Sequence, residues 1–269
     1  MSVVHESDKN RLLDQKTKEA WEKNWEDIPI DKILEIFKYE RVKKQMGIFQ
    51  RALPKNEKIL EGGCGLGPYL IRLRQLGYDV EGIDYNEGPI KKILSFDASL
   101  PVRMGDVTQI PYPDGTFGGY LSLGVIEHFS EGPQKAIREA CRVLRPGGVF
   151  VVAVPTRNIF MDLTFPVRFL KSRPFLRKLL KKPEDNHYWE QYFKRKALIG
   201  YLEEGGFEVR EVHAMDHSHS LVSFSNFFRD KETLDEASPF GLKLGAWCEK
   251  HLTWQTASQM TLICYKKGR

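Results

Sequence analysis

The chain has 269 residues, of which 41% are hydrophobic and 29% are charged, and its formal net charge is +5. This composition is that of an ordinary globular protein, and the mild positive charge permits an anionic partner without requiring one. The longest apolar run, "VFVVAV" at 149–154, is far shorter than the roughly 20 residues that a membrane span needs. We therefore expect a chain that forms a sizeable core and spans no membrane.

Two further features bear on location and on metals. The first residues, "MSVVHESDKNRLLDQ", lack the basic-then-apolar order of an export signal, so we expect a cytoplasmic protein. The four cysteines are scattered without a metal-type pair, which suits reduced thiols. In "HAMDHSHS", His217 and His219 share one face if the segment is extended, but two ligands make a weak metal site. We expect a polar strand end or lid loop there, and no bound metal.

Apolar segments alternate with helical patterns through the middle of the chain. The expected strands are residues 58–63, 78–84, 101–106, 119–124 and 149–155. Helices are expected to begin at Pro68, Pro89 and Pro133, because proline is favoured in a first helical turn. The last of them is expected to end at "RPGG" (145–148). Such alternation, with strands that are apolar almost throughout, predicts a doubly wound, mostly parallel sheet covered on both faces.

The flanks of this region have other patterns. Residues 1–57 are charged and helical in pattern, so we expect a helical N-terminal cap ahead of a main domain at 58–269. Insertions without strand character are expected at about 156–190 and 216–258. A helix around "KALIGYLEEGG" and two more strands, at 207–215 and 260–267, complete the seven strands of the expected α/β fold.

A glycine-rich turn in "ILEGGCGLG" (59–67) follows the first expected strand. An acid about 20 residues further on suits a dinucleotide-binding fold, but Pro68 stands where that motif has its third glycine. A phosphate-binding loop of the lysine-bearing kind is excluded, because no Lys-Ser or Lys-Thr pair follows. S-Adenosylmethionine is the second candidate ligand.

Four segments between about residues 55 and 155 carry a family pattern in order and spacing: "ILEGGCGLG", "VEGIDYN" (80–86), "RMGDVTQIPYPDGTFGGYLSLGVIEHF" (103–129) and "AIREACRVLRPGGVFVVAVP" (136–155). Through them the chain resembles the class I S-adenosylmethionine-dependent methyltransferases, in particular the small-molecule type 11, or UbiE-like, group. The resemblance implies a Rossmann-like sheet whose final strand is antiparallel, with S-adenosyl-L-methionine as cofactor and S-adenosyl-L-homocysteine as product. One departure is Gly118, which stands where the family commonly has an acid of structural importance.

Several of the residue types in these segments suit that cofactor. Glu61, in the first strand, can face a cationic amino group. Gly63 and Gly65 have no side chains, so their backbone amides can approach a ligand closely. Asp84, at the end of the second strand, can accept hydrogen bonds from both ribose hydroxyls. All of them fall at the carboxyl ends of strands, where open parallel sheets bind ligands.

The family resemblance implies further contacts to the cofactor. It implies that Tyr85 flanks the adenine ring and that Asp106 accepts a hydrogen bond from the exocyclic amine. It also implies that Val107 offers a backbone amide and that Gly124 lines the sulfonium end. The predicted cofactor-binding residues are therefore Glu61, Gly63, Cys64, Gly65, Asp84, Tyr85, Asp106, Val107 and Gly124.

Glu127 and His128 follow the fourth strand, where the methyl acceptor is expected. A hydroxyl or protonated amine acceptor needs a base, and the ordinary pKa of histidine suits that role. The alternative is structural, because the "EH" pair can simply order the loop and begin the next helix. We carry both residues as candidate catalytic groups.

The insertion from Arg157 to Lys182 contains eight basic residues and one acid, Asp162. After Pro174 its apolar residues share one helical face, with bases opposite. Such a segment can close over the active site as a lid, which is the preferred interpretation, or lie on an anionic membrane surface as a peripheral contact.

The sequence therefore predicts an enzyme that transfers a methyl group from S-adenosylmethionine to a small-molecule or lipid-like acceptor, with oxygen as the preferred acceptor atom. Nucleic acid is not an expected partner, because no stacking module is recognisable. The alternatives are a non-catalytic module that binds S-adenosylmethionine or a membrane, and a nicotinamide-dependent oxidoreductase. A monomer and a homodimer are both compatible with the sequence.

Overall fold

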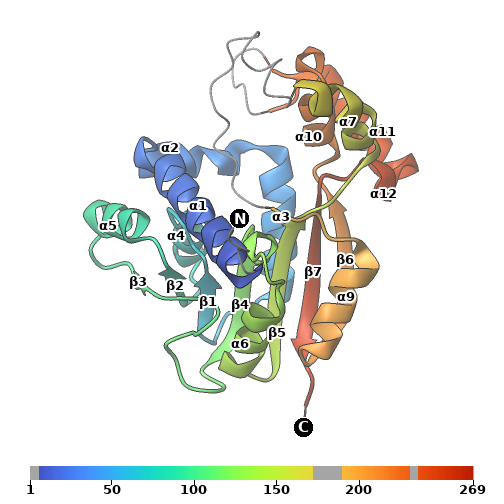
Figure 1. Ribbon diagram of the computed structural model, residues 1–269. Coiled ribbons are helices and arrows are strands. Elements are labelled where there is room, and N and C mark those ends of the chain that lie inside the picture. The colour runs from blue at the N-terminus through green and yellow to red at the C-terminus, as the bar shows by residue number, and fades with distance from the viewer. Residues whose placement is uncertain (1–5, 172–189, 231–235, 269) are drawn as a thin grey trace. The chain divides into compact units, whose positions relative to one another are not determined.

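The computed structural model describes residues 6–171, 190–230 and 236–268 (Figure 1). Contacts between residues divide the chain into two compact units. Unit 1 comprises Met1–Val154, His187–Val212 and Thr261–Arg269, and unit 2 comprises Pro155–Asn186 and His213–Met260. The segments of unit 2 overlap the two insertions that the sequence places at about 156–190 and 216–258.

The strands form one seven-stranded sheet with the order β3-β2-β1-β4-β5-β7-β6. Their bounds are β1 Ile59–Gly62, β2 Val80–Asp84, β3 Val102–Met104, β4 Phe117–Leu123, β5 Leu144–Pro155, β6 Phe207–Met215 and β7 Gln259–Lys266. β1 pairs in parallel with β2 and β4, β2 pairs with β3, and β4 pairs with β5. The mostly parallel, doubly wound α/β sheet predicted from the sequence is confirmed.

The last strand, β7, runs against its two neighbours. Its end lies beside the start of β6, where the backbone N–H of Lys267 donates to the carbonyl of Gly206 at 3.0 Å. Its end also lies beside the start of β5, where Lys266 Nζ donates to the carbonyl of Leu144 at 2.6 Å. Figure 1 shows the same opposite direction of β7 within the sheet. This is the antiparallel final strand that the family resemblance implies.

Helices of unit 1 cover the sheet and precede it. Those between strands are α4 Pro68–Gln75, α5 Glu87–Phe96, the short turn η2 Ile126–His128, α6 Gln134–Val143 and α9 Arg195–Glu204. Those ahead of the sheet are α1 Glu6–Glu26, α2 Ile30–Leu34, η1 Glu35–Lys38 and α3 Glu40–Ala52. In α6, Ala136, Ile137, Ala140 and Val143 share one buried face, as their helical spacing predicts.

Two boundaries differ from the sequence expectation. Helix α5 begins at Glu87, two residues before Pro89. Strand β5 begins at Leu144, so "RPGG" lies within the strand and does not merely end the preceding helix. Leu144 already pairs with Phe117 of β4, and the register shifts before Gly119 pairs with Val149. An irregularity of this kind lets a proline and two glycines lie inside a paired strand.

Unit 2 is helical, and its two segments are the insertions that follow β5 and β6. Its helices are α7 Ile159–Lys171, α10 His217–Phe224, η3 Asn226–Phe228, α11 Pro239–His251 and α12 Thr253–Thr256. The strand end expected in "HAMDHSHS" is confirmed through Met215, but the residues from His217 form α10 and not a loop. His217 is buried and its Nδ1 lies 2.9 Å from Thr256 Oγ1, and the helical turn places His219 on another side of α10.

Across the described ranges, none of these helices has the length and apolar character needed to cross a membrane. The amphipathic pattern expected after Pro174 falls at 172–189, outside the described residues.

Gly118 in β4 has a steric reason to lack a side chain. A Cβ added there would lie 2.3 Å from Oε2 and 2.7 Å from Cβ of Glu57. The carboxylate of Glu57 is held in this position by the Arg145 guanidinium, which donates from both Nε and Nη2. This pairing holds the pKa of Glu57 below its usual range. An acid from the segment before β1 therefore stands close to the position where the family commonly has one on the strand.

We expect Gly118→Ala to destabilise the protein by about 1–3 kcal/mol, because the new methyl group overlaps the Glu57 side chain and displaces its ion pair. The measurement is the free energy of unfolding in denaturant. Adding Glu57→Ala to Gly118→Ala should recover part of the loss. Gly200→Ala in α9 is the matched control, since nothing lies within 4 Å of its added Cβ. Equal stability of Gly118→Ala and the natural protein would contradict this account.

Candidate functional site

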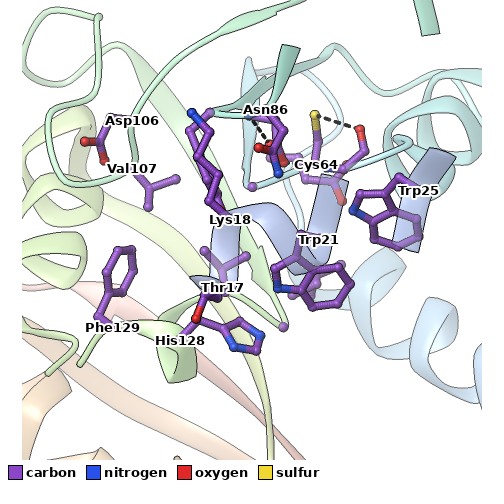
Figure 2. A pocket seen from close by; sticks show the side chains of 18 of the residues that line it. Thr17, Lys18, Trp21, Trp25, Cys64, Asn86, Asp106, Val107, His128 and Phe129 are labelled. Carbon is purple, nitrogen blue, oxygen red and sulfur yellow. Dashed lines mark hydrogen bonds between the residues drawn. The ribbon is translucent and has the colours of Figure 1, made fainter. Parts of the chain in front are cut away.

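A pocket of about 720 Å³ lies at the carboxyl edge of the parallel strands, and every residue that lines it belongs to unit 1. Its walls come from α1, from the glycine turn after β1, from the ends of β2 and β4, and from the segment after β3. Figure 2 shows Cys64, Asn86, Asp106 and His128 around this pocket, together with side chains from α1. Its size is within the roughly 300–1,000 Å³ of small-molecule sites.

The glycine turn joins β1 to α4 and forms the floor of the pocket. Gly63 and Gly65 have φ values of 72° and 52°, in the left-handed region that side chains disfavour. A Cβ on Gly63 would also lie 2.6 Å from the Val125 side chain. The turn therefore brings backbone, with no side chain between, up to the pocket.

Asp84 ends β2 and fixes the glycine turn. Its Oδ2 accepts a hydrogen bond from the backbone N–H of Gly65, and its Oδ1 accepts one from the backbone N–H of Asn86, both at 2.8 Å. Burial raises the pKa of this carboxyl, while these backbone donors act in the opposite direction. Each oxygen keeps a second lone pair, so the carboxylate can still accept from a ligand hydroxyl.

Two buried oxygen atoms at the pocket have no hydrogen-bond partner among the described residues. They are Oε2 of Glu61, whose side chain is 3% exposed, and Oδ1 of Asn86, which is 2% exposed. Burial, and secondarily the nearby charge of Asp84, raises the pKa of Glu61 to about 8. Buried polar atoms are normally satisfied, so these two acceptors suit donors supplied by a ligand.

The far wall is formed by residues after β2 and β3. Asp106 Oδ1 accepts from the backbone N–H and the hydroxyl of Thr108, at 2.7 and 2.8 Å, which orders this turn. Val107 is buried beside it. Tyr85 has an exposed ring, and Lys18 Nζ lies 5.4 Å from the centre of that ring. The wall therefore offers an acid, a buried aliphatic side chain and an aromatic face.

The remaining predicted residues differ in how they meet the pocket. Gly124 lines it with a φ of 72°, and so does Cys64, whose thiol pKa is raised well above its usual range by burial. His128 also lines it. Glu127 does not: its buried carboxyl lies behind Gly124, where a Cβ would be 3.7 Å from Glu127 Oε1.

Glu127 is as deeply buried as Glu61, and its Oε2 also has no hydrogen-bond partner among the described residues. Its side chain is 2% exposed, and burial, with a contribution from Glu190, raises its pKa to about 8. Its backbone carbonyl accepts from the N–H of Gln191 at 3.0 Å, so the turn that carries it is tied to the segment before α9. Among the predicted site residues, Glu127 is the one that the structure sets apart from the pocket.

Helix α1 contributes a wall that the sequence did not reveal. Lys18, Trp21 and Trp25 line the pocket from this helix (Figure 2). The two indole rings stack at 5.2 Å between centroids, and the ring of Trp21 meets that of His128 edge-on at 5.5 Å. Trp25 also lies over the glycine turn, because a Cβ on Gly65 would come within 3.3 Å of its ring.

Lys92 of α5 ties the end of α1 to the sheet domain. Its Nζ donates to the backbone carbonyls of Trp25 at 2.7 Å, of Ile28 at 3.5 Å and of Glu26. A cation at a helix C-terminus satisfies carbonyls that lack helical partners and interacts favourably with the helix dipole. This contact fixes the tryptophan-bearing turn of α1 against the pocket.

A group of three or more side chains suited to metal binding does not occur within the described ranges. The pocket instead offers acids, glycine backbone and aromatic rings at strand ends, which is a set of contacts for an organic ligand with cationic and hydroxyl groups.

Residues 60–152 match a family model described as "Methyltransferase domain". A relative from Mycolicibacterium smegmatis, named "Probable S-adenosylmethionine-dependent methyltransferase/", is 31% identical over 164 residues, which are 61% of this chain and 57% of the relative. The match thus spans little more than half of that relative's length. "Demethylmenaquinone methyltransferase" of Staphylococcus aureus is 29% identical over 182 residues, covering 62% of this chain and 73% of that protein.

Solved structures show the same fold at low sequence identity. A S-adenosylmethionine-dependent methyltransferase from Methanosarcina mazei has a TM-score of 0.59 and 18% identity, covering 82% of this chain and 98% of that one. A S-adenosylmethionine-dependent methyltransferase from Archaeoglobus fulgidus has a TM-score of 0.57 and 18% identity, covering 86% and 97%.

Residues 60–152 thus match a methyltransferase domain, and the resemblance to S-adenosylmethionine-dependent methyltransferases that the four sequence segments indicated is confirmed. The solved methyltransferases share the Rossmann-like fold of this chain, and S-adenosyl-L-methionine is the cofactor that the resemblance implies.

We expect Lys92→Met to loosen the end of α1, because three backbone carbonyls lose their charged donor. Amide hydrogen exchange over residues 21–28 should then become roughly tenfold faster, as local opening is made easier. Lys91→Met is the matched control, since Lys91 is exposed and pairs only along α5 with Glu87. Unchanged exchange in Lys92→Met would show that α1 is held by other contacts.

Proposed function

We propose that the chain binds S-adenosylmethionine in this pocket and transfers its methyl group to a small-molecule or lipid-like acceptor. The observation that carries the proposal is the convergence of Glu61, the glycine turn and Asp84 on one pocket at the ends of β1 and β2. When bound, the cofactor supplies a methyl group already activated by attachment to a sulfonium. The chain's own residues then have to bind, orient and exclude water.

The contacts assigned to the cofactor follow from the unsatisfied Oε2 of Glu61 and from the family resemblance. Glu61 Oε2 receives the amino group of the methionine part, and Asp84 receives the ribose hydroxyls. The adenine lies toward Tyr85, Asp106 and Val107. Lys18 lies near Tyr85, and its positive charge lowers the cost of ionising the buried carboxyl of Asp84. Asp84 thus keeps its hydrogen bonds to the backbone of Gly65 and Asn86 when the cofactor binds.

The acceptor is assigned to the side of the pocket formed by α1 and η2. Trp21 of α1 lies against His128, and Phe129 follows η2 directly, so both bring aromatic rings to the pocket here. Such walls favour an acceptor with a flat, apolar part. The Staphylococcus relative is named for a menaquinone precursor, which is a small molecule of that general kind.

His128 is the group placed to take a proton from a hydroxyl acceptor, since it lines the pocket beside Trp21. We assign Glu127 the supporting role of holding the turn that carries His128, because its carboxyl lies behind Gly124. A base at this position suits an oxygen acceptor, whose hydroxyl must lose its proton, and a protonated amine would use the same base.

Calorimetric titration with S-adenosylmethionine and S-adenosylhomocysteine tests the proposal. We expect both to bind, and Asp84→Ala to weaken binding at least about a hundredfold, because two charge-assisted hydrogen bonds are lost. Asp79→Ala is the matched control, an exposed acid one residue before the other end of β2. NAD and NADH serve as negative controls. If they bound and S-adenosylmethionine and S-adenosylhomocysteine did not, the assignment would be overturned.

A pH dependence follows from Glu61. Its pKa of about 8 in the empty pocket means that it carries a proton at pH 7, whereas a bound ammonium group favours the carboxylate. Binding at pH 7 should therefore release about one proton, and affinity should rise with pH until about pH 8. Above that pH Glu61 is already ionised and the ligand's own amino group begins to lose its charge.

Calorimetry at pH 7 in two buffers of different ionisation enthalpy measures the released proton. Glu61→Gln cannot release one, so its binding heat should not depend on the buffer, and its affinity should be about 10–100-fold lower. Proton release that persists in Glu61→Gln would assign the titration to another group, such as Asp84.

A further inference from the structure

Unit 2 carries exposed aromatic side chains on one side of α11. Phe240 is 57% exposed and Trp247 is 52% exposed, and they lie seven residues apart, which is two helical turns. Phe227 of η3 is 74% exposed, and its ring lies 6.1 Å from that of Phe240. Three large rings thus face solvent on neighbouring elements, where a globular protein ordinarily keeps such rings apart or covered.

Lysines accompany these rings. Lys243 and Lys250 are exposed and follow Phe240 by three and ten residues, which places both along one flank of the aromatic row. We call Phe227, Phe240, Lys243, Trp247 and Lys250 the aromatic–lysine face.

Within α11, all of whose residues are described, no acid lies on this face. Helix α11 contains one acid, Glu249, which is half-buried and lies on the opposite side of the helix from Phe240. Asp230 and Glu236, near the start of α11, are half-buried as well. The exposed charges on α11 itself are therefore positive.

The orientation of the face is fixed by close packing behind it. A Cβ on Gly245 would lie 2.8–2.9 Å from atoms of Ser218 in α10, and one on Gly241 would lie 2.7 Å from the carbonyl of Phe228. Because both glycines face inward, α11 lies directly on α10 and η3, and it cannot rotate to bury its rings. The exposure of Phe240 and Trp247 is thus a consequence of packing within unit 2.

We propose that the aromatic–lysine face docks on an anionic lipid surface. Helices that lie in a membrane interface combine tryptophan and phenylalanine with lysine, whereas lysine is depleted from protein–protein interfaces. Tryptophan is also the side chain most suited to the boundary between headgroups and hydrocarbon. The sequence of residues 157–182, in the same unit, adds eight bases against one acid.

Co-sedimentation of the full chain with vesicles tests this proposal. We expect binding to phosphatidylcholine vesicles that contain phosphatidylglycerol at about 0.05 M NaCl, with much weaker binding at about 0.5 M, where the charges are screened. Phe240→Ser with Trp247→Ser should lower the partition coefficient at least about tenfold, and Lys243→Glu with Lys250→Glu should do so at low salt. Vesicles of phosphatidylcholine alone should bind weakly.

The controls lie in unit 1. Phe96→Ser removes a ring that is 47% exposed, and Lys32→Glu reverses an exposed charge, so both should bind vesicles like the natural protein. Unfolding temperature and S-adenosylmethionine titration confirm that each variant is folded, so failure of the membrane proposal is separate from failure of the proposed function.

Three outcomes would overturn the proposal. The first is no binding to anionic vesicles at low salt. The second is equal binding by the Phe240→Ser, Trp247→Ser variant, which would place the contact elsewhere in the chain. The third is concentration-dependent dimerisation without vesicle binding, lost in the same variant, which would make the face a contact between two copies.

Discussion

The carboxylate of Asp84 is the contact on which the pocket depends. It stands at the end of β2 and accepts the backbone N–H of Gly65, which belongs to the turn after β1. The two strands are paired in register up to this point, so their ends are already close. One buried acid thereby fixes a left-handed glycine turn that has little conformational preference of its own. Every other wall of the pocket is built around that fixed turn.

The pocket also holds two buried acids for which β1 and β2, both described in full, supply no ion-pair partner. Glu61 and Asp84 are both buried, and burial raises the pKa of each. Buried acids of this kind are costly in an empty site and become favourable when a cation enters. Affinity for a ligand with an ammonium group is therefore provided by the same side chains whose burial is costly.

The sheet and the glycine turn could be predicted from the sequence because their signals are local. Apolar runs that end in an acid mark β1 and β2, and the family segments place Asp84 and Asp106 in order. The wall from α1 could not be predicted, because Trp21 and Trp25 meet Gly65 and His128 only through the tertiary fold. A spacing of four residues places both rings on one face of a helix, but it does not indicate what that face covers.

The place of Glu127 shows a second limit of sequence reasoning. Its position beside His128 suggested that the two act together, yet the η2 turn directs one side chain to the pocket and the other behind Gly124. Neighbours in sequence point in different directions whenever the backbone turns tightly. The prediction that "RPGG" only ends the preceding helix is wrong because of another tertiary contact. Leu144 pairs with Phe117, and this pairing overrides the tendency of "RPGG" to break a strand.

The pair formed by Glu57 and Arg145 has a consequence for how this family can vary. Here the acid comes from the segment before β1, and Gly118 leaves the room that it occupies. A relative that carries the acid on the strand would collide with Glu57, so the two arrangements exclude each other. Positions 57 and 118 are therefore expected to change together during descent, through intermediates that have no acid at either position.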